Sequence, residues 1–296
     1  MKKIFLTLLA LLSFVVCNAQ LKTQSNYDTN GNGTVDITDV TATVNKVLGK
    51  AADEHTVVDG ESLNALLLSI DARLKAIEEK LGISGYNGHA YVDLGLPSGL
   101  KWATCNVGAT TPEGYGDYFA WGETEPYYTE GHSQENPCTN WKTNKAGYNW
   151  ASYKWCNGSD SQSKYCTSSS FGTVDNKTVL DLEDDAAHAN WGGSWRMPTK
   201  EEQDELRTKC TWTWGYQNGV SGYTVVGPNG NSLFLPAAGC RINSGLNYVG
   251  SYGSFWSSSL DSDHSDCAYF LFFRSDRVYS CGDYRFYGLS VRPVCP

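Results

Sequence analysis

A twelve-residue segment near the N-terminus carries oxygen-bearing side chains at the spacing of a calcium-binding loop. It reads DTNGNGTVDITD, with a glycine, Gly33, at the sixth position, where such a loop turns sharply. Calcium prefers a cage of hard oxygen ligands at this spacing. The predicted ligands are Asp28, Asn30, Asn32, the main-chain carbonyl of Thr34, Asp36 and Asp39. The alternative is an Asn/Gly-rich turn that holds no ion.

A helix is predicted directly after this loop, from about Ile37 to Leu48, and Gly49 ends it. With this helix, residues 20–49 resemble one repeat of a bacterial dockerin. The resemblance implies Ca²⁺ binding and, as partner, a cohesin in a polysaccharide-degrading assembly. Dockerins normally carry two such repeats, whereas this chain has one.

A narrow apolar seam follows a polar linker over residues 50–58. Apolar residues recur at alternating spacings of four and three, which predicts a coiled-coil helix over residues 59–82. Leucine at the a positions with isoleucine among the d positions favours a homo-trimer or homo-tetramer over a dimer. The seam is formed by Leu63, Leu67, Ile70, Leu74, Ile77 and Leu81. The alternative is an amphipathic helix that packs on its own domain.

Residues 1–19 have the pattern of a secretory signal peptide. Lys2 and Lys3 precede an apolar run, and small residues offer a cleavage site between Ala19 and Gln20. Cys17 leaves lipidation as an alternative. The sequence therefore predicts a secreted or cell-surface protein without a transmembrane span in the mature chain.

Composition limits the remaining partners. The chain has 296 residues and a net charge of −9, which argues against nucleic acid because a nucleic-acid partner requires a basic surface. Removal of the signal leaves nine of the ten cysteines. Export favours disulfides, and we expect a bond between Cys156 and Cys166 across a polar loop.

Residues 89–296 are expected to form an α+β domain. All ten tryptophans of the chain lie between Trp102 and Trp256. A capping box at Thr199 predicts a helix to about Lys209, and short strands separated by turns follow it. A long Gly/Ser/Asn-rich stretch over about residues 124–194 predicts extended loops.

Several motifs of this domain occur together in one known family. They are YVDLGLPSGLKWATCNVGA, FAWGETEP, GGSWRMPTKEEQDEL, FLPAAG, FWSSS and GLSVRPV. In combination they resemble the Fibrobacter succinogenes major paralogous domain family, which implies a secreted bacterial domain with a C-type-lectin-like fold. The calcium-sugar motifs of true C-type lectins are absent, so sugar binding through a bridging calcium is not implied.

The last 79 residues use a restricted set of amino acids. From Asn218 to Pro296 there is no Lys, Glu, Gln or Met, although a surface of this length would normally use them. Ser, Gly, Tyr, Asp, Asn and Arg dominate instead, as in antibody binding loops. The pattern resembles the variable proteins of diversity-generating retroelements, which implies diversified surface positions. The alternative is a Tyr/Ser-rich tail of fixed sequence.

Alternation in the segment AYFLFFR predicts which side chains are exposed. If Leu271 and Phe273 face the core, then Phe270, Phe272 and Arg274 line an exposed face. The complete predicted ligand-binding set is Tyr248, Tyr252, Asp261, Asp263, His264, Asp266, Phe270, Phe272, Arg274, Asp276, Arg277, Tyr279, Asp283, Tyr284, Phe286 and Tyr287.

No motif of known catalytic chemistry occurs in the sequence. It lacks a nucleophile elbow, a phosphate-binding loop, a dinucleotide fingerprint and a zinc-protease helix. Two glutamate pairs, Glu123 with Glu125 and Glu201 with Glu202, could act as glycosidase acids, but a framework turn and a helix cap explain them more simply. We therefore expect a non-enzymatic, multivalent adhesin-like protein that binds a protein or glycan on another surface. The alternative is a glycan-binding component of a dockerin-linked assembly.

Overall fold

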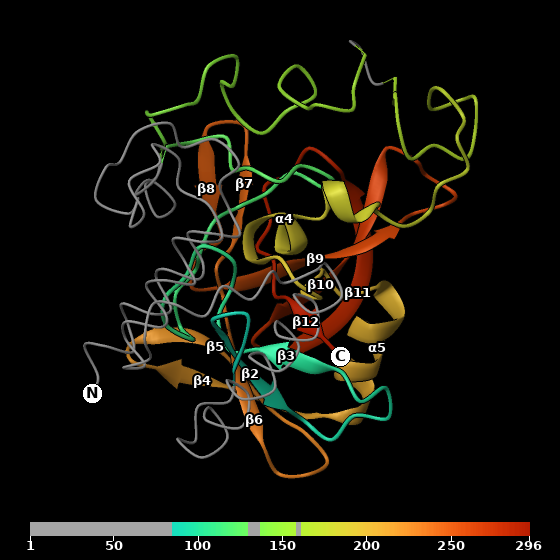
Figure 1. The fold of residues 1–296 in the computed structure, drawn as a ribbon. Helices are drawn as coiled ribbons and strands as arrows, with labels where there is room; N and C mark the ends of the chain where they lie inside the picture. The colour runs from blue at the N-terminus through green and yellow to red at the C-terminus, as the bar shows by residue number, and fades with distance from the viewer. Residues whose placement is uncertain (1–84, 130–136, 158–160) are drawn as a thin grey trace, which may run out of the picture. The chain divides into compact units, whose positions relative to one another are not determined.

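The computed structural model describes residues 85–129, 137–157 and 161–296 (Figure 1). All of them lie within one compact unit, Leu74–Pro296. In this part of the chain, antiparallel strands dominate and helices are few and short, so the domain is a sheet-rich α+β fold. None of the described helices has the length and apolar character needed to cross a membrane.

Four antiparallel sheets form the framework. The first has the strand order β1-β2-β3-β12, the second β11-β10-β9, the third β4-β5-β6, and the last pairs β7 with β8. Their bounds are β1 Gly85–Tyr86, β2 His89–Asp93, β3 Lys101–Ala103, β4 Thr211–Gln217, β5 Val220–Val226, β6 Ser232–Pro236, β7 Cys240–Ile242, β8 Gly245–Asn247, β9 Tyr252–Leu260, β10 Cys267–Arg274, β11 Arg277–Tyr284 and β12 Val294–Cys295. The last strand returns to pair with β3, which brings the C-terminus beside the first sheet (Figure 1).

Three short helical segments interrupt the strands: η1 Leu182–Asp184, α4 Ala186–Trp191 and α5 Lys200–Lys209. The capping box predicted for α5 is confirmed, because the Thr199 hydroxyl accepts from the Glu202 amide and the Glu202 carboxylate accepts from the Thr199 amide. Arg196 also pairs with Glu202 through two nitrogens at 2.6 and 2.7 Å. The start of α5 is therefore fixed by local side chains.

The sheet β9-β10-β11 carries the core on both sides. On one side, Leu271 and Phe273 pack with Phe255 and Leu206, the latter from α5, which lies beside β11 (Figure 1). Gly253 stands directly opposite Phe273, where a Cβ would overlap the aromatic ring. On the other side, Trp256 and Phe270 join a second apolar cluster. Strand β10 is therefore buried on one face along its first half, at Ala268 and Phe270, and on the other face along its second half, at Leu271 and Phe273.

A long segment between β3 and η1 contains no helix or strand in its described residues. The prediction of loops over about residues 124–194 is therefore confirmed up to η1 and wrong beyond it, where η1 and α4 lie. It is held by buried aromatic side chains rather than by a sheet. Tyr118, Tyr127, Tyr128 and Tyr148 are each completely or almost completely buried and form a third apolar cluster with Tyr153. Burying these large rings offsets the entropy of ordering the loops.

Candidate functional site

The predicted ligand-binding residues fall into an exposed aromatic group and several separate positions. The group, called here the aromatic face, comprises Tyr248, Tyr252, Phe272, Arg274 and Tyr279. In register, Phe272 is opposite Tyr279 on β11, and Arg274 is opposite Tyr252 on β9. All of these side chains are at least partly exposed. Side chains directly opposite one another point to the same face of a sheet, so β9, β10 and β11 together build this surface.

Close ring contacts make the aromatic face continuous. Tyr248 and Tyr252 are stacked with centroids 4.6 Å apart, Tyr252 meets Phe272 edge-on at 5.2 Å, and Phe272 lies 5.0 Å from Tyr279. Such aromatic pairs add stabilisation beyond their buried area. The rings hold one another in place while Tyr248 remains 55% exposed and Tyr279 39% exposed.

Tyr248 also adopts a backbone conformation that disfavours its side chain. Its φ angle is 61°, in the left-handed region that non-glycine residues rarely enter. The turn is fixed by the Tyr248 carbonyl, which accepts from the amides of Ser251 and Tyr252. Strain of this kind at an exposed residue is typical of functional positions.

Charged residues border the aromatic face at the β10–β11 turn. Arg274 pairs with Asp276 through two nitrogens at 2.7 and 3.2 Å, and Arg277 reaches the same carboxylate at 3.3 Å. These hydrogen bonds from Arg274 and Arg277 lower the pKa of the Asp276 carboxyl, which keeps it ionised. The turn therefore presents two cations and one anion beside the rings.

The predicted exposure of Phe270 is wrong. Its side chain points to the same side of β10 as Phe272, as the alternation predicted, but it is 5% exposed and packs edge-on against Trp256. The reason is that β10 is a central strand, and the second apolar cluster covers this half of its outer face. On this face, only the end of the strand next to the turn reaches the surface.

A second aromatic group lies at the other end of β11. Tyr284 is 42% exposed and stacks on Phe286, and both rings contact Trp150 from the loop segment. The expected exposure of Phe286 is also wrong, because this ring is 9% exposed and is enclosed by Trp150 and Tyr287. Tyr287 is also half-buried, so the rings of this group mainly pack against one another and expose little area to solvent.

Apart from Asp276, the predicted acidic positions lie away from the aromatic face. Asp261, Asp263, His264 and Asp266 occupy the β9–β10 connection, at the opposite end of β10 from Arg274. Asp263 and His264 are exposed, whereas Asp261 is half-buried and accepts from the Asp263 amide. Burial raises the pKa of Asp283 on β11, and the bond from the Tyr284 amide offsets part of that rise. These residues do not form one site with the tyrosines.

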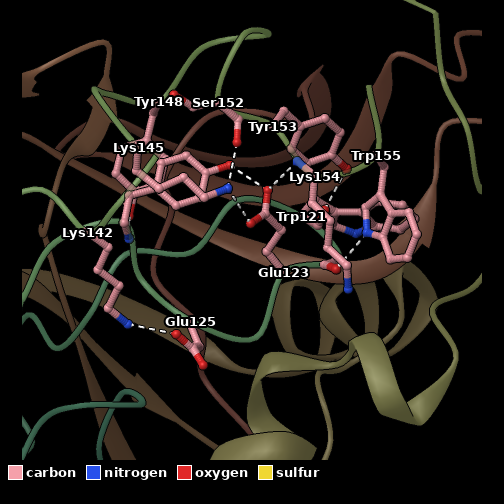
Figure 2. Close-up of polar contacts among 12 residues, drawn as sticks. Trp121, Glu123, Glu125, Lys142, Lys145, Tyr148, Ser152, Tyr153, Lys154 and Trp155 are labelled. Atoms are coloured by element: carbon pink, nitrogen blue, oxygen red, sulfur yellow. Dashed lines mark hydrogen bonds and ion pairs between the residues drawn. The ribbon is translucent and has the colours of Figure 1, made fainter. Parts of the chain in front are cut away.

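Glu123 lies at the centre of a polar cluster in the loop segment. Its Oε1 accepts from the Tyr127 hydroxyl at 2.5 Å and from the Lys154 amide at 2.7 Å, and its Oε2 accepts from Lys145 Nζ at 3.0 Å (Figure 2). We call Glu123, Tyr127, Lys145 and Lys154 the Glu123 cluster. Burial raises the pKa of Tyr127, and the Glu123 charge raises it further, so this hydroxyl stays protonated as a donor.

The Glu123 cluster lines a surface cavity of about 330 Å³. Glu123 itself is 6% exposed, whereas the Glu125 side chain is 76% exposed and turns to Lys142 at 2.9 Å (Figure 2). The two carboxylates therefore point to different partners. This arrangement favours the interpretation of a framework turn over that of a paired set of acids, because the groups that hold Glu123 also hold the loop segment together.

An acidic group in η1 is already neutralised by lysine. The carboxylates of Asp181, Glu183 and Asp184 lie close enough together to hold a metal ion. Lys164 Nζ, however, lies 2.8 Å from Asp181, 3.6 Å from Glu183 and 2.6 Å from Asp184. An ammonium therefore occupies the place that a cation would take.

The role of Arg285 was not predicted from the sequence. This residue is completely buried and donates to the Tyr153 hydroxyl and to the carbonyls of Tyr165, Ser265 and Lys164. It joins the loop segment to the C-terminal tail. The sequence offered one signal for this role: Arg285 lies between Tyr284 and Phe286, so strand alternation would direct its side chain to the face opposite theirs.

Other predictions are contradicted or fall outside the described residues. The Cys156–Cys166 disulfide is not formed; the Cys166 thiol instead donates to the Ser168 carbonyl at 3.1 Å. The signal peptide (1–19), the calcium loop with its ligands (20–49), the linker (50–58) and the seam helix (59–82) lie outside the residues that the structure describes. They remain predictions from the sequence.

Comparisons with protein-family models, curated protein sequences and solved structures found no match to this chain.

Proposed function

We propose that residues 89–296 form a non-enzymatic, lectin-like binding head whose ligand surface is the aromatic face. The observation that carries this proposal is Tyr248, an exposed tyrosine held at a positive φ and stacked on Tyr252. Exposed rings in fixed positions give large contact area at low entropic cost, which is how tyrosine-rich binding surfaces work.

The shape of this surface favours a macromolecular ligand. Its rings come from the turn before β9 and from three adjacent strands, and charged residues border them. A protein or a glycan on another surface would cover rings and charges together. Buried tyrosine and arginine contacts are frequent centres of binding energy in such interfaces.

The remaining parts of the proposal come from the sequence of residues 1–84. Export by the signal peptide would place the head outside the cell, and Ca²⁺ at Asp28, Asn30, Asn32, Thr34, Asp36 and Asp39 would order the dockerin-like repeat, with a cohesin as its partner. A trimeric or tetrameric seam would join several heads. Several weak heads on one stalk gain avidity when they meet the same surface.

The binding test compares three forms of the full chain on a glycan array and on arrayed bacterial surface proteins. Wild type and Leu182→Ser should bind the same array members, because Leu182 is an exposed apolar residue whose segment contacts the far end of β9. The double variant Tyr248→Ser with Tyr279→Ser should bind them at least about tenfold more weakly. Equal binding by all three forms would refute the aromatic face as the ligand surface.

Diversification of the tail is tested in DNA. We expect a near-copy of the 3′ end downstream of the gene, differing from it at template adenines, and different residues at Tyr248, Tyr252 and Tyr279 among isolates. An invariant tail with no such copy would mean that the head has one fixed ligand.

A further inference from the structure

Strand β11 is the outer strand of its sheet, and most of the outward main-chain groups along its free edge have no partner among the described residues. Arg274 and Arg277 flank a two-residue turn and therefore form a hydrogen-bonded pair. The main-chain groups of Arg277 thus point toward β10, those of Val278 point away from it, and the alternation continues along β11. The Arg285 amide, which donates to the Asp266 carbonyl, keeps the same alternation. The outward N–H and C=O groups therefore belong to Val278, Ser280, Gly282 and Tyr284. Those of Tyr284 already bond to the Asp283 carboxylate and the Tyr287 amide, which leaves three residues with free outward groups.

This edge lacks the features that usually prevent strand pairing. Natural edge strands are protected by lysine, proline, bulges or a covering segment. Strand β11 contains no lysine or proline, and its register with β10 is regular over all eight residues. Its charged residues are Arg277 and Asp283, near its two ends. A regular, partly exposed eight-residue edge of this kind is suited to accept another strand.

The sequence of β11 is complementary to itself in the antiparallel direction. With a twofold axis at Ser280, Val278 lies opposite Gly282 of a second copy, and all three outward N–H and C=O groups of each copy meet a partner. The same axis places Arg277 opposite Asp283 of the second copy, on one face of the sheet. Both ends of the pair would then carry opposite charges side by side.

The state of Asp283 within one chain agrees with this arrangement. Its carboxyl is half-buried and accepts one hydrogen bond, from the Tyr284 amide at 2.8 Å. Burial raises its pKa, and no cation contributes to that shift. The Arg277 side chain is 52% exposed and contacts Asp276 at 3.3 Å. A second copy would bring this arginine to the carboxylate.

We infer that β11 pairs with β11 of a second copy of this chain, forming one continuous antiparallel sheet across a twofold axis. Residues directly opposite in such a pair share a face, so the two aromatic faces would lie side by side on the same side of the sheet. The pairing does not depend on the ligand-binding proposal, but it would give that surface two adjacent halves.

The first test blocks the outward main chain at Ser280. Proline there removes an outward N–H and leaves the bonds to β10 intact, which an edge strand tolerates. The matched control is Ser280→Ala, because both variants lose the hydroxyl that donates to Asp204 at 2.7 Å. The full mature chain also carries Ile70→Lys and Ile77→Lys to remove any association through the seam, and a reductant prevents intermolecular disulfides.

Mass by sedimentation velocity, measured across a wide concentration range, gives the result. We expect the chain with the seam substitutions and its Ser280→Ala form to be dimers. Ser280→Pro should weaken dimerisation by about tenfold or more, since one hydrogen bond is lost from each copy. A monomeric parent chain, or equal dimerisation by both variants, would overturn the inference.

The second test reverses the charges. Arg277→Asp and Asp283→Arg should each weaken the dimer, because each places like charges opposite one another twice. The double reversal should restore it, which loss of folding cannot do; thermal unfolding of each variant checks the fold. Failure of the double variant to recover would contradict the twofold register.

The same measurements identify other occupants of the edge. If a segment of residues 1–84 covers β11 within one chain, the protein will be a monomer, and Ser280→Pro will lower its melting temperature relative to Ser280→Ala. If only a foreign strand uses the edge, the protein will be a monomer and the two variants will melt alike. Either result excludes the second copy.

Discussion

The Glu123 cluster and the aromatic face differ in where their polar and aromatic groups find partners. Glu123 receives three hydrogen bonds from within the chain and is almost completely buried. Tyr248 and Tyr279 contact other rings of the face, yet a large part of each remains exposed. When all hydrogen-bond donors to a buried carboxylate come from the surrounding loops, the carboxylate stabilises those loops. Ordered rings left at the surface are available to another molecule.

This difference leads to four measurable consequences, beginning with the largest effect. Phe270→Ala should lower the free energy of unfolding by about 3–5 kcal/mol, because it leaves a cavity beside Trp256. Phe272→Ala, two residues along the same face, should cost about 1–2 kcal/mol because this ring is half-buried. Urea unfolding measures both. Equal losses would mean that the aromatic face is part of the core.

Glu123→Ala should cost about 3 kcal/mol, since the Tyr127 hydroxyl and the Lys154 amide lose their acceptor and Lys145 keeps only the Ser152 carbonyl. The matched control is Glu125→Ala, whose exposed pair with Lys142 is expected to contribute less than about 1 kcal/mol. Thermal unfolding of the two variants compares them directly. A negligible effect of Glu123→Ala would remove the structural role proposed for the cluster.

Substitutions at Tyr248 separate strain from packing. Glycine adopts a positive φ freely, whereas alanine does not, so Tyr248→Gly should be more stable than Tyr248→Ala by about 1 kcal/mol. Both variants lose the ring that stacks on Tyr252 and should lose binding equally. Alanine and glycine variants of equal stability would show that the left-handed conformation carries no strain.

The smallest effect concerns acid stability at η1. Hydrogen bonds from Lys164 and then Lys177 lower the pKa of Asp181 to about 2, below its ordinary value. Because the folded-state pKa is depressed, this contribution is present above about pH 4 and is lost as the pH falls towards 2. Asp181→Asn should therefore flatten the pH dependence of stability in this range. Glu183→Gln, at a 78% exposed side chain, is the control and should leave the dependence unchanged.

Local signals predicted much of the framework correctly. The capping box at Thr199 gave the helix that the structure places at Lys200–Lys209, and the sheet-rich α+β class follows from the short strands after it. The alternation of Leu271 and Phe273 with Phe272 and Arg274 also predicted their two faces. These features depend on residues close together in the chain, so their spacing is sufficient.

The errors arose where distant segments meet. Phe270 and Phe272 are identical in type and face, yet Phe270 is a buried member of the second apolar cluster, whereas Phe272 packs against that cluster and stays half-buried. The Glu123 cluster joins residues from two loops, and Arg285 binds carbonyls more than a hundred residues away. Spacing along the chain contains no information about such contacts.

For this protein, the sequence by itself determined local features: a capped helix, alternating strands, and a tail without Lys, Glu, Gln or Met. Only the tertiary structure decided which of those alternating side chains reach the surface, which carboxylate is enclosed, and which strand edge remains open. The physical reason is that burial and hydrogen-bond satisfaction depend on what packs against a residue. The packing partners of a residue are set by the whole fold, whereas the alternation of side chains between the two faces of a strand is set by the local backbone.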